Sequence, residues 1–154
     1  MAYRTIKVKK YGDAIEEFTA TAAITPGMLV QLDSTGADLV KPHCTADGNV
    51  LEMFALENEL MGGGIDLAYA SGDPVQVWIP GDGDIVLGIL AASQNVAIGD
   101  FLVSNGDGYL RKWITPTSGT VTDIAANPIV GQAVNAVNLT LSTLPDNHIK
   151  VRIC

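Results

Sequence analysis

Few side chains in this sequence combine a reactive type with a spacing that supports catalysis or metal binding. His43 stands beside Cys44, and an imidazole with a thiol is the pair found in thiol nucleophiles and in zinc sites. Neighbouring side chains of an extended segment point to opposite faces, so this pair alone cannot chelate a metal well. The other histidine, His148, has neither a partner at metal-ligand spacing nor a nucleophile motif beside it. We therefore expect no enzyme activity, no metal site and no cofactor.

Acidic turns offer another chemistry, the binding of a cation. Asp82 and Asp84 lie in the run GDGD, and Asp107 lies in NGDG. Neither run continues into the spaced oxygen ligands and closing glutamate of a calcium-binding loop, so turn formation explains them. A cation held by these three aspartates at an assembly interface is the alternative. The glycines at 62–64 do not form a phosphate loop, because no Lys followed by Ser or Thr comes after them.

Size and composition predict one domain that contacts other chains. A chain of 154 residues can bury about 70% of its unfolded surface without a disulfide or a metal. Hydrophobic residues make up 47% of it and charged residues only 17%, which favours a protein whose surface is partly covered by a partner. No apolar run approaches the roughly 20 residues that span a bilayer, and the first ten residues lack a signal-peptide core. We expect synthesis in the cytoplasm, with Cys44 and Cys154 as ordinary thiols.

Charge separates the ends of the chain from its middle. The net charge is -8 at pH 7, which argues against nucleic-acid binding, because that binding depends on Lys and Arg neutralising phosphates. Six of the nine basic residues lie near the two ends: Arg4, Lys7, Lys9, Lys10, Lys150 and Arg152. A basic terminal arm can be attracted to an acidic neighbour, including another copy of the chain. The alternative is that these charges only keep terminal strands from aggregating.

The elements that position these residues are short strands, and two hairpins repeat one design. The first copy is ITPGMLVQLDSTGADLVK at 24–41, and the second is VAIGDFLVSNGDGYLRKW at 96–113. In each copy a glycine, Gly27 or Gly99, opens a strand, and a second glycine nine positions later closes the turn. The repeat predicts an all-β scaffold. It favours binding or assembly over catalysis, because neither copy holds a nucleophile, a metal cage or a phosphate cradle.

Alternating or continuous apolar runs predict further strands at 5–9, 75–79, 85–90, 129–137 and 149–153. Residues 11–23 fit either a helical turn or an extended strand, and 50–56 fit either a buried strand or a short helix. About eight short strands with 16 glycines and 7 prolines predict a small β-barrel or sandwich at 24–154, preceded by an extended N-terminal arm at 1–23. Trp78, on the polar face of its strand, and Trp113 are either covered by a neighbouring loop or anchor a subunit interface.

Three runs follow one another in a distinctive order: AYASGD, then GDIVLGILAASQNVAIGDFL, then a glycine-closed turn and YLRK. In this order they resemble bacteriophage capsid cement proteins, which are also called head decoration proteins. The similarity is best over 24–113 and continues through PIVGQAVNAV to the terminal IKVRIC. Residues 114–127 and the first twenty resemble nothing in particular.

The resemblance implies a β-tulip-like fold and a non-enzymatic structural protein of the virion. It implies a homotrimer on the outer face of the phage head, which binds the major capsid protein and stabilises the shell across subunit seams. Neither nucleic acid nor a membrane is an expected partner. The residues expected to bind the capsid are Tyr3, Arg4, Ile6, Lys7, Val8, Lys9, Lys10 and Tyr11. The alternative is a β module that recognises carbohydrate or a cell surface through Trp78, Trp113 or Tyr109 around a groove.

Overall fold

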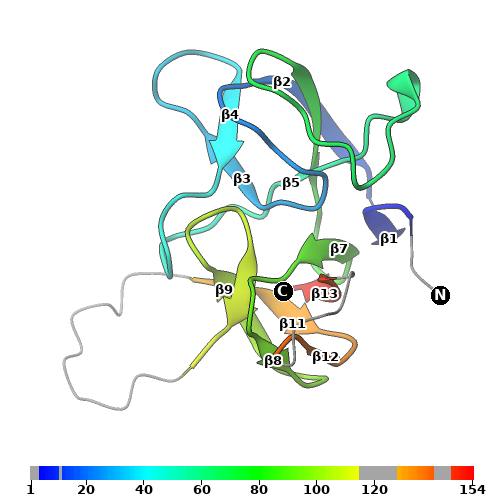
Figure 1. Ribbon diagram of the computed structural model, residues 1–154, viewed down its shortest axis with the longest axis vertical. Helices are drawn as coiled ribbons and strands as arrows, with labels where there is room; N and C mark the ends of the chain where they lie inside the picture. Colours follow the sequence, from blue (N-terminus) through cyan, green and yellow to red (C-terminus); the bar gives the residue numbers. More distant parts are fainter. Residues whose placement is uncertain (1–3, 11, 115–127, 141–146) are drawn as a thin grey trace.

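Most of the ordered elements of the chain are β-strands (Figure 1). The computed structural model describes residues 4–10, 12–114, 128–140 and 147–154. A six-stranded sheet has the order β1 (Lys7–Lys9), β7 (Ile85–Ile89), β13 (His148–Ile153), β11 (Ile129–Ala133), β9 (Phe101–Ser104) and β10 (Leu110–Lys112). A five-stranded sheet has the order β3 (Val30–Leu32), β4 (Leu39–Pro42), β2 (Ala14–Ala20), β6 (Pro74–Ile79) and β5 (Phe54–Ala55). A small ribbon pairs β8 (Asn95–Val96) with β12 (Val137–Asn138).

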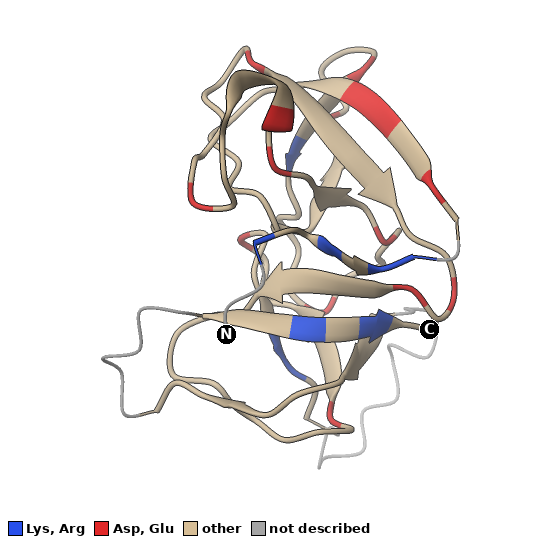
Figure 2. Ribbon diagram, turned by 90° about the vertical axis from the view of Figure 1, so that its right-hand side faces the viewer, with Lys and Arg blue, Asp and Glu red and all other residues tan. Residues whose placement is uncertain are grey.

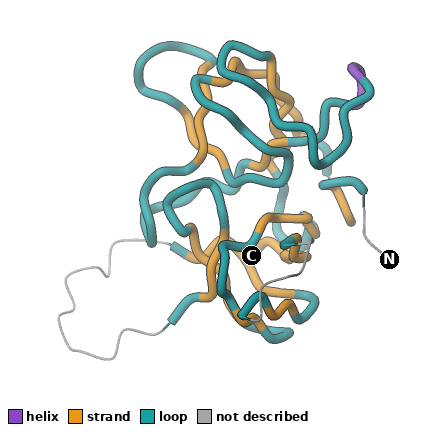
Figure 3. The backbone as a smooth tube through the Cα atoms, in the orientation of Figure 1, coloured by secondary structure: helices purple, strands orange, loops and turns teal. Residues whose placement is uncertain are grey.

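The five-stranded sheet occupies the upper half of the view in Figure 1 and the six-stranded sheet the lower half. All strand pairs are antiparallel except β2 with β4, which is parallel. A short 3₁₀ helix, η1 (Glu59–Met61), lies on the loop between β5 and β6 (Figure 3). Within the described residues, no helix is long and apolar enough to cross a membrane. The all-β prediction is confirmed, and the described strands form separate sheets.

The two sheets share their core. All five residues of β7 are buried, as the continuous run at 85–90 predicts. Phe54 and Trp78 of the five-stranded sheet pack into the apolar cluster of the six-stranded sheet. Ile89 of the six-stranded sheet packs into the cluster of the other. Each sheet therefore buries its inner face partly against side chains that the other supplies.

Four strands follow the same β-turn, at residues 25–28, 70–73, 81–84 and 97–100. In each turn the third residue is a glycine with φ between 90° and 94°, and the amide of the fourth residue donates to the carbonyl of the first at 3.0–3.2 Å. This is the pattern of a type II turn, whose third residue needs a positive φ and favours glycine. The glycine amide also donates to a carbonyl on another strand at 2.7–2.9 Å. Each turn therefore anchors the start of its strand to a neighbour.

An aspartate at the fourth position caps three of these turns. The carboxylates of Asp73, Asp84 and Asp100 each accept the amide of the first residue of the turn at 2.8 Å. In the fourth turn, Met28 takes this position with its Sδ 3.4 Å from the Thr25 amide. Three of the Gly-Asp pairs in the sequence, at 72–73, 83–84 and 99–100, are thus turn caps. The repeat is confirmed for the opening turns of both hairpins.

The closing turns of the two hairpins differ. Between β9 and β10, Gly106 and Gly108 have φ of 90° and 82°. Between β3 and β4, the left-handed residue is Asp38, with φ of 56°, while Gly36 lies in the same turn without a positive φ. The second half of the repeat is therefore less regular than the glycine spacing predicts.

The N-terminal segment does not form a free arm. β2 pairs with β6 over six residue pairs, from Ala14 with Ile79 to Thr19 with Pro74. β1 pairs with β7 in the other sheet. The predicted boundary between an arm at 1–23 and a domain at 24–154 is wrong for the described residues, because β1 is part of the six-stranded sheet and β2 is part of the five-stranded sheet. The apolar face of residues 5–9 needs a surface to lie on, and this chain's own β7 supplies it.

Candidate functional site

Basic residues from both ends of the chain come together on one face of the six-stranded sheet. β7 lies between β1 and β13, and the strand register places Ile85 beside Lys9 on one side and beside Arg152 on the other. Lys150 lies beside Leu87, two positions along β13 from Arg152. Lys150 and Arg152 are two positions apart on β13, so their side chains leave the sheet on the same side. Lys9 lies beside Ile85, the residue that also pairs with Arg152, just after a shift in the register between β1 and β7. Figure 2 shows the basic residues of β1 across the middle of the view and those of β13, which ends at the C-terminus, with β7 between the two strands.

These three positive charges are close enough to act together. Adjacent strands are about 4.8 Å apart, so Lys9 and Arg152 are separated by roughly 10 Å at the backbone, and Lys150 is about 7 Å from Arg152. These separations are no larger than about one Debye length at moderate salt. We call Lys9, Lys150 and Arg152 the basic face. It is built on a body whose net charge is -8.

Three basic residues near the two hairpins pair with carboxylates. Lys41 Nζ lies 3.7 Å from Asp33, and Lys112 Nζ lies 2.7 Å from Asp100. Arg111 forms an ion pair with Asp47. Positive charge is thus partly neutralised around the two hairpins.

Lys7 and Lys10 share one acidic partner at the end of β1. Their Nζ atoms lie 3.6 Å and 2.6 Å from the carboxylate of Asp13. The hydrogen bond from Lys10 lowers the pKa of Asp13, with smaller contributions from the charges of Lys7 and Lys10. This group orients the chain between β1 and β2, and it reduces the positive charge available at these two lysines.

Ile6 fixes β1 to the body. Its side chain is fully buried, and its amide donates a hydrogen bond of 3.2 Å to Oε2 of Glu57. Its carbonyl accepts the amide of Leu87 at 2.9 Å. A Cβ on Gly27 would lie 3.4 Å from Ile6 Cδ1 and 2.9 Å from the Leu87 carbonyl oxygen. The absence of a side chain at Gly27 therefore leaves room for Ile6 to pack beside β7.

The structure separates the predicted capsid-binding residues into three groups. Tyr3 and Tyr11 lie outside the described residues. Ile6 is fully buried, so its assignment as a capsid contact is wrong. Val8 is partly buried and packs against the core, and its assignment stays a prediction. The remaining residues reach the surface at least in part: Arg4, Lys7, Lys9 and Lys10.

The prediction that Trp78 anchors a subunit interface is wrong, because this side chain is fully buried in the apolar core. Its Nε1 has no hydrogen-bond partner within the described part of the chain. Trp78 also cannot line a carbohydrate groove. Trp113 is half-buried, and its backbone amide donates to the Phe101 carbonyl at 2.8 Å. Its role in a subunit interface stays a prediction.

His43 links two loops. Its Nδ1 lies 2.7 Å from the hydroxyl of Ser104, and its Nε2 lies 3.1 Å from the carbonyl oxygen of Asn49. A carbonyl can only accept, so Nε2 carries the proton and Nδ1 accepts from the serine. Ser104 is fully buried, which keeps its hydroxyl from solvent. Sequence reasoning missed this pair, because the two residues are 61 positions apart.

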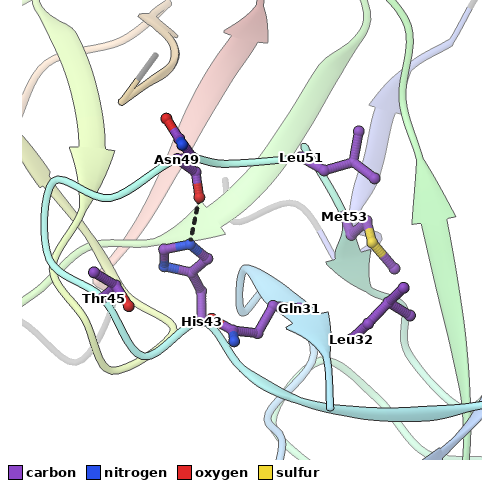
Figure 4. Close-up of a pocket in the computed structure, with 7 residues that line it drawn as sticks. All are labelled: Gln31, Leu32, His43, Thr45, Asn49, Leu51 and Met53. Carbon is purple, nitrogen blue, oxygen red and sulfur yellow. Dashed lines mark hydrogen bonds between the residues drawn. The ribbon is translucent and has the colours of Figure 1, made fainter. Parts of the chain in front are cut away.

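A surface groove of about 440 Å³ adjoins this histidine (Figure 4). Leu32, Leu51 and Met53 form its apolar side, and the ring of His43, which also lines the groove, turns toward Asn49. Across the described residues, no group of three or more His, Cys, Asp or Glu side chains is placed to hold a metal ion. Two of the three carboxylates proposed for a cation are used within their own turns: Asp84 accepts the Gly81 amide, and Asp107 accepts the amide of Tyr109 at 3.1 Å. The role proposed for Asp82 stays a prediction.

The chain is similar in structure to a known phage protein. No protein-family model matches the sequence, and no curated protein does. Among solved structures, the chain is similar to the N base of the head fiber gp8.5 of bacteriophage phi29. The TM-score is 0.57 with 15% sequence identity, and the alignment covers 93% of this chain and 95% of the other. At this identity the likeness shows that the two chains share a fold over nearly their whole length.

Proposed function

We propose that the protein is a structural component of a bacteriophage head that attaches to the outer surface of the capsid. The observation that carries this proposal is the shared fold with the base of a phage head fiber, over 93% of the chain. The resemblance of residues 24–113 to head decoration proteins supports the same role from the sequence. The partner is the major capsid protein, and the protein resides on the outside of the virion after synthesis in the host cytoplasm.

Charge favours the outer surface over the DNA-filled interior. A body of net charge -8 is repelled by packaged phosphate. The basic face provides the exception, a local positive patch that can meet an acidic surface of the shell. Attachment thus uses a face of the folded body, because the N-terminal strands are already paired within it.

Stabilisation of the shell requires that one particle contact several subunits. In a homotrimer, three basic faces would bind in parallel, and after the first contact the others would form at effective concentrations near millimolar. Weak single contacts would then sum to lasting attachment across subunit seams. Sedimentation equilibrium of the free protein measures the oligomer, and thermal rupture of heads with and without the protein measures the stabilisation.

The attachment experiment is co-sedimentation with DNA-free heads of the phage that encodes the chain. The test variant reverses the basic face: Lys9→Glu, Lys150→Glu and Arg152→Glu. The matched control is Lys41→Glu, Arg111→Glu and Lys112→Glu, which exchanges the same residue types and changes the net charge equally. Circular dichroism must show both variants folded.

We expect the test variant to lose most of its attachment and the control to keep it. Raising the salt from 50 to 500 mM should release the wild-type protein, because exposed charges are screened. Equal attachment of the two variants would refute the basic face as the contact. Failure of the wild-type protein to sediment with any head preparation would refute the head role itself.

A further inference from the structure

One edge of β2 is covered only in part. β2 pairs with β6 along Ala14–Thr19, but it pairs with β4 only at Thr19 and Ala20. On the side away from β6, no strand of the described chain pairs with residues 14–18. The five-stranded sheet therefore has an open edge in the middle of its strand order.

The backbone groups on that edge can be assigned by alternation. The Thr19 amide donates toward β4, to the Asp38 carbonyl at 2.8 Å. The Ala20 amide donates to the opposite side, to the Asp73 carbonyl just before β6 at 2.9 Å. In an extended strand these directions alternate, so the amides and carbonyls of Ile15 and Glu17 point to the open edge. Those of Glu16 and Phe18 point to β6.

The open edge is exposed and acidic. Ala14, Ile15, Glu16 and Glu17 are all exposed, with Ile15 at 37%. Figure 2 shows the acidic positions of this strand at the outer margin of the molecule. Successive side chains lie on opposite faces of a strand, so the two glutamates place one negative charge on each face.

This charge pattern selects the partner. A second copy pairing along the same edge would bring glutamates of two strands together, which is destabilising. A strand with Lys or Arg at two successive positions would place one cation beside Glu16 and another beside Glu17. Unpaired strand edges are ready templates for another strand, and this edge has no lysine or proline that would block one.

We propose that the open edge of β2 binds an extended segment of another protein that carries two adjacent basic residues between β-forming residues. The segment adds a strand to the five-stranded sheet by hydrogen bonds to the backbone of Ile15 and Glu17, and its basic pair contacts the two glutamates. This inference does not depend on the head role.

The probe is the synthetic peptide acetyl-Thr-Val-Lys-Lys-Val-Thr-amide, with acetyl-Thr-Val-Glu-Glu-Val-Thr-amide as its control. Both are titrated into the full ¹⁵N-labelled chain, and amide hydrogen exchange is measured by NMR. We expect the basic peptide to slow exchange at Ile15 and Glu17. Exchange at Glu16 and Phe18, which already bond to β6, should change little.

The matched variants carry Glu16→Lys with Glu17→Lys, or Glu59→Lys with Asp66→Lys. Both pairs change the net charge equally, and all four residues are exposed. We expect the first pair to bind the basic peptide about tenfold more weakly and to bind the acidic peptide instead, because two cross-strand attractions become repulsions. The second pair should bind as the wild type does.

Three results would overturn the proposal. One is protection that falls elsewhere on the chain or nowhere at millimolar peptide. Another is equal binding of the two peptides, which would remove the charge match. The third is a concentration-dependent dimer, lost with Glu17→Pro, because a second copy would then be the strand that occupies the edge.

Discussion

The backbone amide of Ile6 donates a hydrogen bond to Oε2 of Glu57, across 51 positions of sequence. Both residues are buried, and the isoleucine carbonyl is bonded to β7 at the same time. Burial and the negative charge of Glu57 raise the pKa of nearby Tyr69 to about 12, so that phenol stays protonated and donates to the Leu56 carbonyl at 2.7 Å. Three parts of the chain therefore form one packed unit: the N-terminal segment, β7, and the loop that precedes η1.

Truncation of Ile6 should destabilise the whole domain. We expect Ile6→Ala to reduce the free energy of unfolding by about 3 kcal/mol, because a fully buried side chain leaves a cavity. Urea denaturation followed by tryptophan fluorescence measures the loss. The control is Ile98→Ala, at a side chain that is 71% exposed, which should cost less than about 0.5 kcal/mol. A free arm, in contrast, would make the two substitutions equally mild.

The repeated turn makes a separate prediction about backbone conformation. Gly72 has φ of 94° with no atom within 4 Å of an added Cβ, so Gly72→Ala tests strain alone. We expect a loss of about 1 kcal/mol. Gly64→Ala is the matched control, because Gly64 is equally open but lacks a positive φ. Thermal denaturation by circular dichroism should give a lower melting temperature for the first variant and nearly the wild-type value for the second.

Gly27→Ala should cost more than Gly72→Ala. The two glycines share the same turn geometry, but a Cβ on Gly27 would lie 2.9 Å from the Leu87 carbonyl. This contact forces β7 or the turn to move, and it adds to the strain of the positive φ. The same melting experiment ranks the two variants. An equal loss for both would show that the turn, rather than its fit against β7, sets the cost.

Local signals in the sequence predicted much of the fold. The run at 85–90 is apolar throughout, and β7 is buried on both faces. Glycine at 27 and 99 marked the opening turns of two hairpins, because few other residues adopt a positive φ. Alternation of Ile6 and Val8 with lysines marked the first strand.

Long-range pairings could not be predicted in the same way. Alternation at residues 75–79 suggests that one face of β6 meets solvent, but Trp78 packs into a second apolar cluster on the opposite face from Val77. The sequence placed basic residues at both ends of the chain. It did not show that β7 would lie between the terminal strands and unite those charges on one face, because that depends on which strands pair.

The buried pair of His43 and Ser104 should contribute to stability. Ser104→Ala removes the donor to Nδ1 and leaves a buried acceptor unsatisfied, which costs about 1–3 kcal/mol. The control is Ser71→Ala, because the Ser71 hydroxyl makes an exposed hydrogen bond of 3.1 Å to the Thr21 carbonyl. Urea denaturation should show the larger loss for Ser104→Ala. Similar losses would indicate that the imidazole contact contributes nothing beyond an ordinary surface bond.

Acid should destabilise the protein through Asp33 among other carboxylates. Hydrogen bonds from the Thr21 hydroxyl, at 2.7 Å, and from the Thr35 amide lower its pKa below the ordinary 3.8. Folding therefore favours the carboxylate, and its contribution to stability is present above pH 4 and is lost as the pH falls through the lowered pKa. We expect Asp33→Asn to be less stable than the wild type at pH 7, and the gap to be smaller at pH 2.5, because the wild-type carboxylate loses its contribution as the pH falls. Urea denaturation at the two pH values measures this difference, with the exposed Asp66→Asn as a control that should match the wild type at both. A gap that persists unchanged at pH 2.5 would assign the loss to side-chain packing instead of charge.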